Sequence, residues 1–348
     1  MFKIRNKFST LFIFLLITVA STRGAVTQEI TVAFQIPLEH HLAKNVLFFK
    51  KELEKISSNS VSVSINDYGA YLKDIKDQKD SNITQNYFLE KDILEAVQSR
   101  KVEIGMISLS RLSKLIPLAD IFHQPFIIDS EKKAADMVAK DSVVRRSIEN
   151  SLRNLGVMTL WWQPYGSVIL VSNGSTVSNP EQMKDKKVRV FGETLGNVVL
   201  ASGGKPTAIP NSLQYFAYKH KKVDIGMTTI ADIKEKKIWE VMDTISLTNN
   251  ANLQFLMIAN RSWWNSISPN LRSYISTTAT AAEVESVKVL KSLEAESYKQ
   301  AIENGMKIVL LSNDDRDYWK EKSSPIYKKF LEKTGAKGQE VFDIVNSF

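Results

Sequence analysis

The sequence predicts an α/β protein with two lobes, and three observations lead to this prediction. Strand and helix patterns alternate along the chain, which is typical of βαβ units. About 323 of the 348 residues follow position 25, and this length exceeds what one hydrophobic core usually organises. Each half of the chain also carries a similar segment, residues 101–106 and residues 222–227. We therefore expect two similarly built lobes.

The first 25 residues have the pattern of a signal peptide. A basic head over residues 1–7 precedes an apolar run over residues 11–20, which is too short to span a membrane comfortably. Cleavage is expected after Ser21 or after Gly24. The chain has no cysteine, which excludes a lipid-anchored cysteine and a disulfide framework. We predict export to the periplasm without a lipid anchor, and no later apolar stretch reaches membrane-spanning length.

The elements after the signal peptide follow from hydrophobic periodicity. Apolar residues alternate as in a strand over 30–34, recur at steps of three and four as in an amphipathic helix over 42–56, and alternate again over 61–65. Two more helix and strand pairs are predicted, over 92–100 with 102–107 and over 212–220 with 223–227.

The two similar segments each end a predicted strand with an acidic residue, an apolar residue and a glycine. In the first half these are Glu103, Ile104 and Gly105. We expect the glycine to let the chain pass closely by whatever lies in the crevice at the strand end.

Arg189 is the strongest single candidate for a binding residue. It follows a turn at Asn179-Pro180 and lies on a short β-branched run that ends at Gly192. A guanidinium on a rigid strand can bind a carboxylate through two parallel hydrogen bonds, which a lysine cannot do. The alternative is a surface arginine on an edge strand.

Charge and motifs argue against nucleic-acid binding and catalysis. The formal charge of +8 loses Lys3, Arg5 and Lys7 on cleavage, which leaves 8 − 3 = +5 without a long basic block. The chain has no cysteine nucleophile, no Gly-x-Ser-x-Gly and no His-Glu-x-x-His. We predict that the protein is not an enzyme and needs no cofactor. A carboxylate pair assembled only in space stays open at this point.

Other polar and aromatic clusters have two interpretations each. His40-His41 could bind a metal, but no third ligand lies at a recognisable spacing, so a loop near the cleft or plain surface is favoured. The polar segment 73–85 lacks the glycine and terminal glutamate of a calcium loop, which favours a solvated insertion. Trp161-Trp162 and Trp263-Trp264 belong either to the core or to the cleft.

Several segments together resemble the periplasmic solute-binding proteins of TRAP (tripartite ATP-independent periplasmic) transporters, dicarboxylate-binding type. The resemblance runs through essentially the whole mature chain. The segments that carry it are residues 30–34 with His40, residues 93–98 before 102–105, residues 121–126, residues 183–190 around Arg189, Gly204-Lys205-Pro206, Pro210, Tyr215, Val223-Asp224, Trp263 and Ser268-Pro269.

The resemblance implies two α/β lobes of a Venus-flytrap receptor, joined by crossing strands and a long helix. It suggests lobe I over 26–162 with 252–285 and lobe II over 163–251 with 286–348. It also implies that Arg189 matches the family's carboxylate-binding arginine. The further binding candidates are Tyr165 at the lobe crossover, Tyr215, Thr228, His40, Asn211 and Ser108.

Departures from the family pattern bear on the ligand. Where many relatives carry a second arginine, this chain reads Gly166-Ser167-Val168, and Thr228 stands where an asparagine is common. The site is therefore expected to be less cationic, and a monocarboxylate with an apolar body is favoured.

The resemblance implies a monomeric receptor that closes on a small organic acid and delivers it to the membrane permease subunits of a TRAP transporter. The alternative is a periplasmic sensor that presents the bound solute to a signalling receptor.

Overall fold

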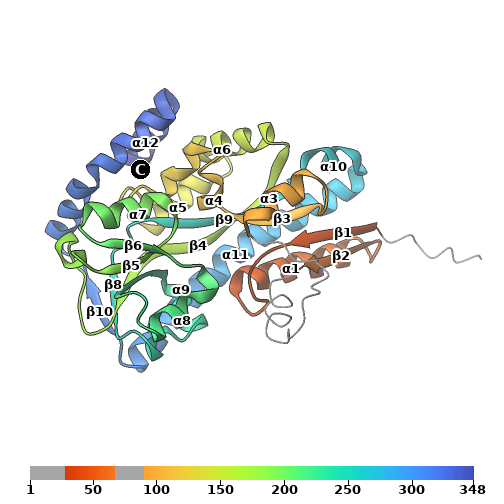
Figure 1. Cartoon of the computed structure of the whole chain (residues 1–348). Coiled ribbons are helices and arrows are strands. Elements are labelled where there is room, and N and C mark those ends of the chain that lie inside the picture. The colour runs from red at the N-terminus through yellow and green to blue at the C-terminus, as the bar shows by residue number, and fades with distance from the viewer. Residues whose placement is uncertain (1–27, 67–89) are drawn as a thin grey trace, which may run out of the picture.

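The computed structural model describes residues 28–66 and 90–348 (Figure 1). The predicted signal peptide and the polar segment 73–85 lie outside these ranges. Across the described ranges, no helix combines the length and the apolar character that crossing a membrane requires.

The first lobe is built on a sheet with the strand order β2-β1-β3-β9-β4. Strand β1 is parallel to β2 and β3, whereas β9 is antiparallel to both β3 and β4. The strands are β1 (Gln28–Ala33), β2 (Val61–Asn66), β3 (Ile104–Ser108), β9 (Asn252–Asn260) and the first part of β4 (Val157–Ser172). The helices are α1 (His41–Ile56), α3 (Glu90–Gln98), α4 (Leu109–Leu112), η1 (Pro117–His123), α5 (Glu131–Val138), α6 (Val143–Asn154) and α10 (Arg261–Ser266).

The second lobe continues from the far end of β4, which pairs there with β7 and β8. Strand β5 lies between β6 and β7, so it is not an edge strand. The strands are β5 (Lys187–Val190), β6 (Lys205–Ala208), β7 (Ile225–Thr229), β8 (Thr244–Leu247) and β10 (Lys307–Leu310). The helices are η2 (Pro180–Met183), α7 (Gly192–Ala201), η3 (Asn211–Leu213), α8 (Gln214–Lys219), α9 (Ile230–Glu235) and η4 (Ile238–Glu240).

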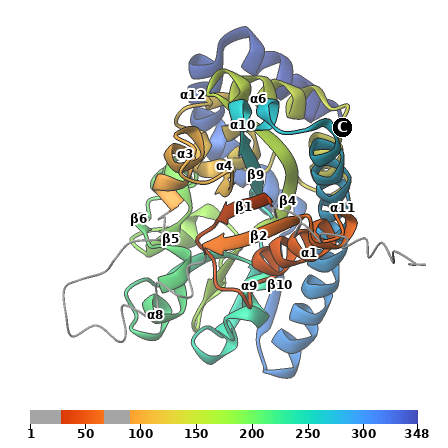
Figure 2. The same cartoon turned by 90° about the vertical axis from the view of Figure 1, so that its right-hand side faces the viewer.

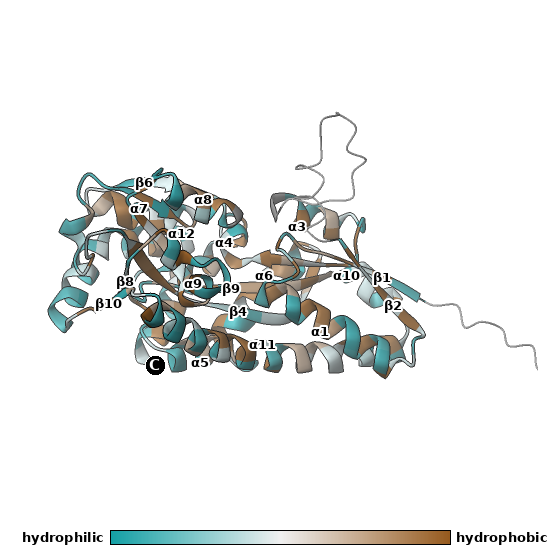
Figure 3. Ribbon diagram, turned by 90° about the horizontal axis from the view of Figure 1, so that it is seen from below, coloured by the Kyte–Doolittle hydropathy of each residue, from teal (hydrophilic) through white to brown (hydrophobic). Residues whose placement is uncertain are grey.

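Strands β4 and β9 and two long helices connect the lobes. The 16-residue β4 passes from one sheet into the other, and its register with β9 shifts between Thr159 and Trp161 and again between Pro164 and Gly166. Helix α11 (Pro269–Glu303) begins at the cap Ser268 and packs on α1, α9 and β4. Figures 2 and 3 show α11 running along both lobes. The C-terminal α12 (Asn313–Ser347), which is interrupted by a kink at Gly335, packs on η1 and α7, so it also contacts both lobes.

This architecture confirms the predicted fold class, a two-lobe α/β protein with crossing strands and a long helix. Figure 3 shows apolar residues on the central strands and both apolar and polar residues on the helices. The exact division into 26–162 with 252–285 and 163–251 with 286–348 stays a prediction.

The two similar segments begin their strands two residues later than predicted, at Ile104 and Ile225. The acidic residue of each segment instead accepts a hydrogen bond from a neighbouring strand. Glu103 Oε2 accepts from the Thr31 main-chain N–H at 2.8 Å, and Asp224 Oδ2 accepts from that of Lys187 at 2.8 Å. Both lobes therefore hold adjacent strands together with the same kind of hydrogen bond, from a main-chain N–H to an acidic side chain.

The expected role of the glycines in these segments is wrong. A β-carbon on Gly105 would lie 2.6 Å from Ile93 Cγ2, and one on Gly226 would lie 2.0 Å from the Tyr218 hydroxyl. Both glycines allow a helix to pack closely on a strand. Neither one lines the crevice between the lobes.

The tryptophans belong to the core. Trp161 and Trp162 are fully buried, and Trp263 is 4% exposed within the largest hydrophobic cluster. Trp264 packs against the same cluster with a partly buried ring. None of the four lines the cavity described next.

Candidate ligand-binding cleft

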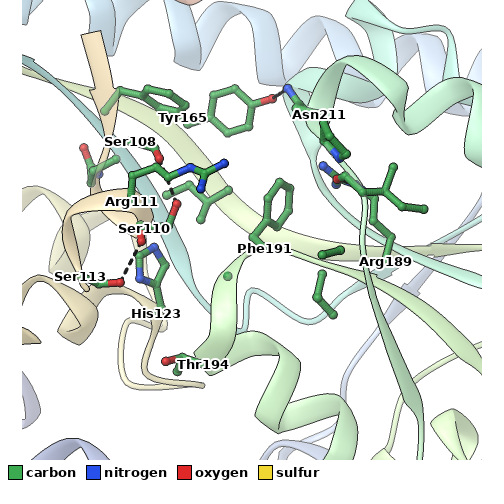
Figure 4. Close-up of a pocket in the computed structure, with 18 of the residues that line it drawn as sticks. Ser108, Ser110, Arg111, Ser113, His123, Tyr165, Arg189, Phe191, Thr194 and Asn211 are labelled. Atoms are coloured by element: carbon green, nitrogen blue, oxygen red, sulfur yellow. Dashed lines mark hydrogen bonds between the residues drawn. The ribbon is translucent and has the colours of Figure 1, made fainter. Parts of the chain in front are cut away.

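A cavity of about 1650 Å³ lies between the two lobes. It is larger than the roughly 300–1,000 Å³ of common small-molecule sites, so a small ligand fills only part of it. Side chains from both lobes line it, and Figure 4 shows ten of them labelled. Six of the seven predicted binding residues are among the lining residues: His40, Ser108, Tyr165, Arg189, Asn211 and Tyr215.

The lobes touch on two sides of this cavity. Thr194 on α7 donates from Oγ1 to Asp120 Oδ2 on η1 at 2.6 Å. The main-chain N–H of His41 on α1 donates to Glu235 Oε1 on α9 at 2.7 Å. The cavity is therefore enclosed by direct contacts between the lobes.

Arg189 lies on β5 with only 1% of its surface exposed, so it is not a surface arginine. Its Nε donates to the Ile209 carbonyl at 3.1 Å and its Nη1 to the Met227 carbonyl. The guanidinium carbon lies 4.3 Å from the centre of the Phe191 ring. Among the described residues, no carboxylate lies within 4 Å of this guanidinium. The Tyr218 hydroxyl also interacts with this guanidinium. A buried cation held by neutral groups favours an anionic partner, because burial of an unpaired charge is costly.

Asp232 on α9 is the centre of a buried polar network beside Arg189. Tyr165 donates from its hydroxyl to Asp232 Oδ1 at 2.8 Å and accepts from Asn211 Nδ2 at 2.8 Å. Lys236 pairs with the same Asp232 oxygen and donates to Asn211 Oδ1 at 3.1 Å. Burial opposes ionisation of Asp232, but Lys236 and His40 outweigh it and hold the pKa of Asp232 well below its usual range. The Lys236 charge is thus balanced by Asp232.

Thr228 is the predicted residue that does not line the cavity. It is fully buried on β7, where its Oγ1 donates to Asp232 Oδ2 at 3.0 Å and accepts from Gln214 Nε2 at 2.6 Å. In this structure Thr228 therefore orients Asp232 from behind the cavity wall.

His40 and His41 lie at the start of α1, where the side chain of His40 caps the helix. His40 Nε2 is 3.2 Å from Glu235 Oε2, and His41 Nδ1 is 3.0 Å from the same oxygen. Tyr165 stacks on the His40 ring at a centroid distance of 5.6 Å. Burial lowers the pKa of His40 below its usual value, and the neighbouring His41 and Lys236 add to this effect.

Tyr215 occupies the rim of the cavity. Its hydroxyl donates to Glu240 Oε2 at 2.6 Å, and its ring lies edge-on to the exposed Phe216. In the described state this phenol is therefore engaged by the protein.

The first lobe contributes residues that the sequence interpretation missed. Arg111 lines the cavity from α4, and Figure 4 shows it on the opposite side of the cavity from Arg189. His123 and Gln124 also line it, and the buried His123 Nε2 and Gln124 Oε1 have no hydrogen-bond partner among the described residues.

The signals for these missed residues differ in strength. Arg111 follows the end of β3 by three residues, and strand ends in α/β folds are where ligands bind, so its position could have indicated it. Lys236 carries no such signal, because it stands in an ordinary charged stretch, Lys234-Glu235-Lys236-Lys237.

Comparison with known proteins agrees with a two-lobe binding protein. The sequence model of the family DctP, described as bacterial extracellular solute-binding protein, family 7, matches residues 84–334. The chain is 23% identical over 256 residues to the ectoine-binding periplasmic protein TeaA of Halomonas elongata, covering 72% of this chain and 75% of TeaA. It is 24% identical over 249 residues to the C4-dicarboxylate-binding periplasmic protein DctP of Vibrio cholerae, covering 70% and 73%.

Solved structures have the same fold at lower identity. DctP6 of Bordetella pertussis, an extracytoplasmic solute receptor that binds pyroglutamic acid, aligns with a TM-score of 0.82 at 16% identity, covering 92% of this chain and all of the other. A TRAP periplasmic solute-binding protein of Shewanella oneidensis with bound succinate aligns with a TM-score of 0.80 at 19% identity, covering 92% and 99%.

Proposed function

The chain belongs to family 7 of the bacterial extracellular solute-binding proteins, the TRAP-type periplasmic receptors, and on this premise we propose that it captures a small organic acid between its lobes through Arg189. It delivers the acid to the permease subunits of a TRAP transporter. Export to the periplasm as a monomer is part of the same proposal and is supported by relatives described as periplasmic. Membership in a family of binding proteins confirms the predictions of the receptor family and of a chain that is not an enzyme.

The burial of Arg189 without a carboxylate partner carries this proposal. The guanidinium is 1% exposed and lines the cavity between the lobes. A ligand carboxylate would supply the missing negative charge, and Arg189 would bind it through charge-assisted hydrogen bonds. Such bonds contribute about 1.5–3 kcal/mol each, which corresponds to one or two decades in affinity.

The charge balance favours a ligand with one carboxylate and an apolar body. Asp232 neutralises Lys236, whereas the buried Arg189 has no carboxylate partner among the described residues. Apolar side chains line the cavity nearby: Met106, Phe191, Ile209, Leu253 and Phe255. Pyroglutamate, bound by DctP6, has one carboxylate on a compact ring and illustrates this class.

A C4-dicarboxylate is the second candidate, and the position of Arg111 favours it. Arg111 lies across the cavity from Arg189, so it could receive a second carboxylate. Relatives described as binding C4-dicarboxylates or succinate are a reason to test this second class of ligand against the monocarboxylates. Val168, at the position where relatives can carry an arginine, is fully buried on β4 and does not line the cavity.

Lobe closure follows from the placement of these groups on different lobes. Arg189, Asn211 and Lys236 belong to the second lobe, whereas His40, Ser108 and Arg111 belong to the first. A ligand that contacts both sets binds the closed state better than the open state, and only this differential affinity can shift the equilibrium between them.

A panel of ligands measured by thermal shift tests the proposal. Stabilisation follows RT ln(1 + [L]/Kd), so the shifts rank affinities at equal concentration. Pyroglutamate and ectoine should raise the melting temperature more than succinate or malate. Larger shifts with the C4-dicarboxylates would overturn the preference for one carboxylate, and no shift with any organic acid would overturn the proposed function.

The role of Arg189 is tested with the best ligand of the panel. Calorimetry should show that Arg189→Lys weakens binding at least about tenfold, because a lysine cannot form the bidentate contact. Arg261→Lys is the matched control, since Arg261 is exposed outside the cleft. Equal affinities of Arg189→Lys and the control would contradict the carboxylate contact.

A further inference from the structure

The folded chain places a third potential metal ligand, Glu235, next to the histidine pair at the start of α1. Spacing along the sequence could not reveal this residue. Glu235 is 194 residues away along the chain, yet its carboxylate lies against both imidazoles. The three groups offer ligand atoms within 4.8 Å of one another. Two imidazoles and one carboxylate form a donor set suited to zinc.

The distances agree with three ligands around one ion. His40 Nε2 is 3.2 Å and His41 Nδ1 is 3.0 Å from Glu235 Oε2. Two ligands of a tetrahedral zinc ion with bonds of about 2.0–2.2 Å lie roughly 3.3–3.6 Å apart. Two of the three ligand pairs therefore lie near the spacing that zinc requires, and all three lie within 4.8 Å of one another, so the side chains must rotate to place a zinc ion between them.

An unpartnered imidazole nitrogen gives an independent indication. His40 is 7% exposed, and its Nε2 is buried without a hydrogen-bond partner among the described residues, although Glu235 Oε2 is only 3.2 Å away. The nitrogen and the oxygen are thus close without being aligned for a hydrogen bond. A bound ion would give this buried nitrogen a partner once the His40 ring, which stacks on His41, turns toward it.

The surrounding charges favour a cation at this place. Asp232 Oδ1 lies 3.8 Å from His40 Nε2, and the nearby positive group, Lys236, is paired with Asp232. Glu235, Asp232 and Lys236 alone leave one negative charge beside the two imidazoles, and Arg189, which also acts on Lys236, is the cation that the ligand carboxylate would balance.

Coordination requires local rearrangements. The hydrogen bond between His41 Nδ1 and Glu235 Oε2 is replaced by bonds to the metal, and the His40 and His41 rings, stacked with centroids 4.4 Å apart, turn so that both nitrogens face the ion. The His40 ring proton also changes its place. His40 Nδ1 accepts a hydrogen bond from the Leu42 main-chain N–H at 3.2 Å, which places the ring proton on Nε2. When Nε2 binds a metal, the proton moves to Nδ1 and this long cap bond is lost. A bound zinc ion is strong enough to replace a single cap.

We propose that His40, His41 and Glu235 bind a zinc ion that bridges the two lobes. His40 and His41 come from the first lobe and Glu235 from the second, so the ion favours the closed state. His40 and Glu235 also line the cavity, so a water molecule or a ligand oxygen can complete the coordination from there.

Zinc binding by the chelator-stripped protein without any organic acid tests this proposal separately from the proposed function. Calorimetry with zinc chloride should show one site per chain and a rise in melting temperature. His41→Ala and Glu235→Gln should each weaken zinc binding roughly 100-fold, as expected when a ligand of a three-residue site is lost. His220→Ala is the matched control, because His220 is exposed and lies outside the cluster.

A second measurement keeps the test independent of folding defects in the variants. Cobalt(II) in place of zinc should give the visible absorption of a tetrahedral site in the wild type and in His220→Ala, but not in Glu235→Gln. The absence of saturable zinc binding by the wild type would overturn the proposal. Zinc binding that survives both His41→Ala and Glu235→Gln would overturn it as well, whatever the outcome with organic acids.

Discussion

Glu294 on α11 should make the protein less stable as the pH rises through neutrality. Its carboxyl lies against the crossing strand, because a β-carbon on Gly166 would be 2.7 Å from Glu294 Oε1. Burial, with a contribution from Glu131, raises the pKa of Glu294 from 4.5 to about 7. No ion pair of the described residues involves this carboxyl.

The sign and size of the effect follow from the shift. Below pH 4.5 the carboxyl is protonated in both the folded and the unfolded chain, so it contributes nothing. Between pH 4.5 and 7 the unfolded chain releases the proton while the folded chain retains it, which progressively favours unfolding. Above pH 7 the full penalty is present, and a difference of 2.5 pKa units corresponds to about 3 kcal/mol.

The substitution Glu294→Gln removes the titration and nearly preserves the shape. Urea unfolding at pH 4.5 and at pH 8 should show that Glu294→Gln gains about 3 kcal/mol over the wild type between the two values. Glu296→Gln is the matched control on the same helix, with a side chain 40% exposed. A stability difference between Glu294→Gln and the wild type that does not change with pH would refute this reasoning.

Three further outcomes are expected. Arg145→Met should lower the free energy of unfolding by about 3–5 kcal/mol, because it leaves Glu149 and Glu283 without their buried partner. Denaturant unfolding should show a much smaller loss for the exposed control Arg146→Met, and equal losses would contradict the ion-pair argument. Gly226→Ala should lower the stability by about 1–3 kcal/mol, because its methyl would overlap the Tyr218 hydroxyl, and an unchanged melting temperature would show that α8 can yield. Spin labels on cysteines introduced at the exposed Lys51 and Leu200 should approach one another when the organic acid is added, and should keep the ligand-free distance in Arg189→Ala. A wild-type distance that does not change when ligand is bound would rule out lobe closure.

The order of strands and helices was predictable because it depends on local periodicity. The alternation over residues 30–34 and the steps of three and four over 42–56 correspond to β1 and α1. The first residues of these strands were less predictable. The side chains of Glu103 and Asp224 accept hydrogen bonds from neighbouring strands, and neither residue is part of the strand that follows it. The role of the glycine in each segment was also predicted wrongly, because the glycine packs against a helix that only the fold brings next to it.

The candidate site was predictable where a residue lies on a recognisable segment and not where only the fold brings residues together. Arg189 and Tyr165 could be named because they lie on the strands that form and cross the second lobe. Glu235 could not be matched to His40 and His41 across 194 residues, and the pair of Lys236 with Asp232 has no distinctive sequence context. The binding of the organic acid by any of these residues stays a prediction.

Tyr165 connects the binding cavity to the hinge. It lies on β4 immediately before Gly166, where the register with β9 shifts and the strand leaves the first sheet. Its ring stacks on His40 of the first lobe, while its hydroxyl is held by Asp232 and Asn211 of the second. Burial and Asp232 raise the pKa of Tyr165 well above its usual value, so the hydroxyl keeps the proton that it donates. One side chain at the crossover is thus engaged by both lobes, and opening must break either the stack or the hydrogen bonds. In the proposed receptor, the equilibrium between open and closed states therefore depends on a residue that also lines the cavity.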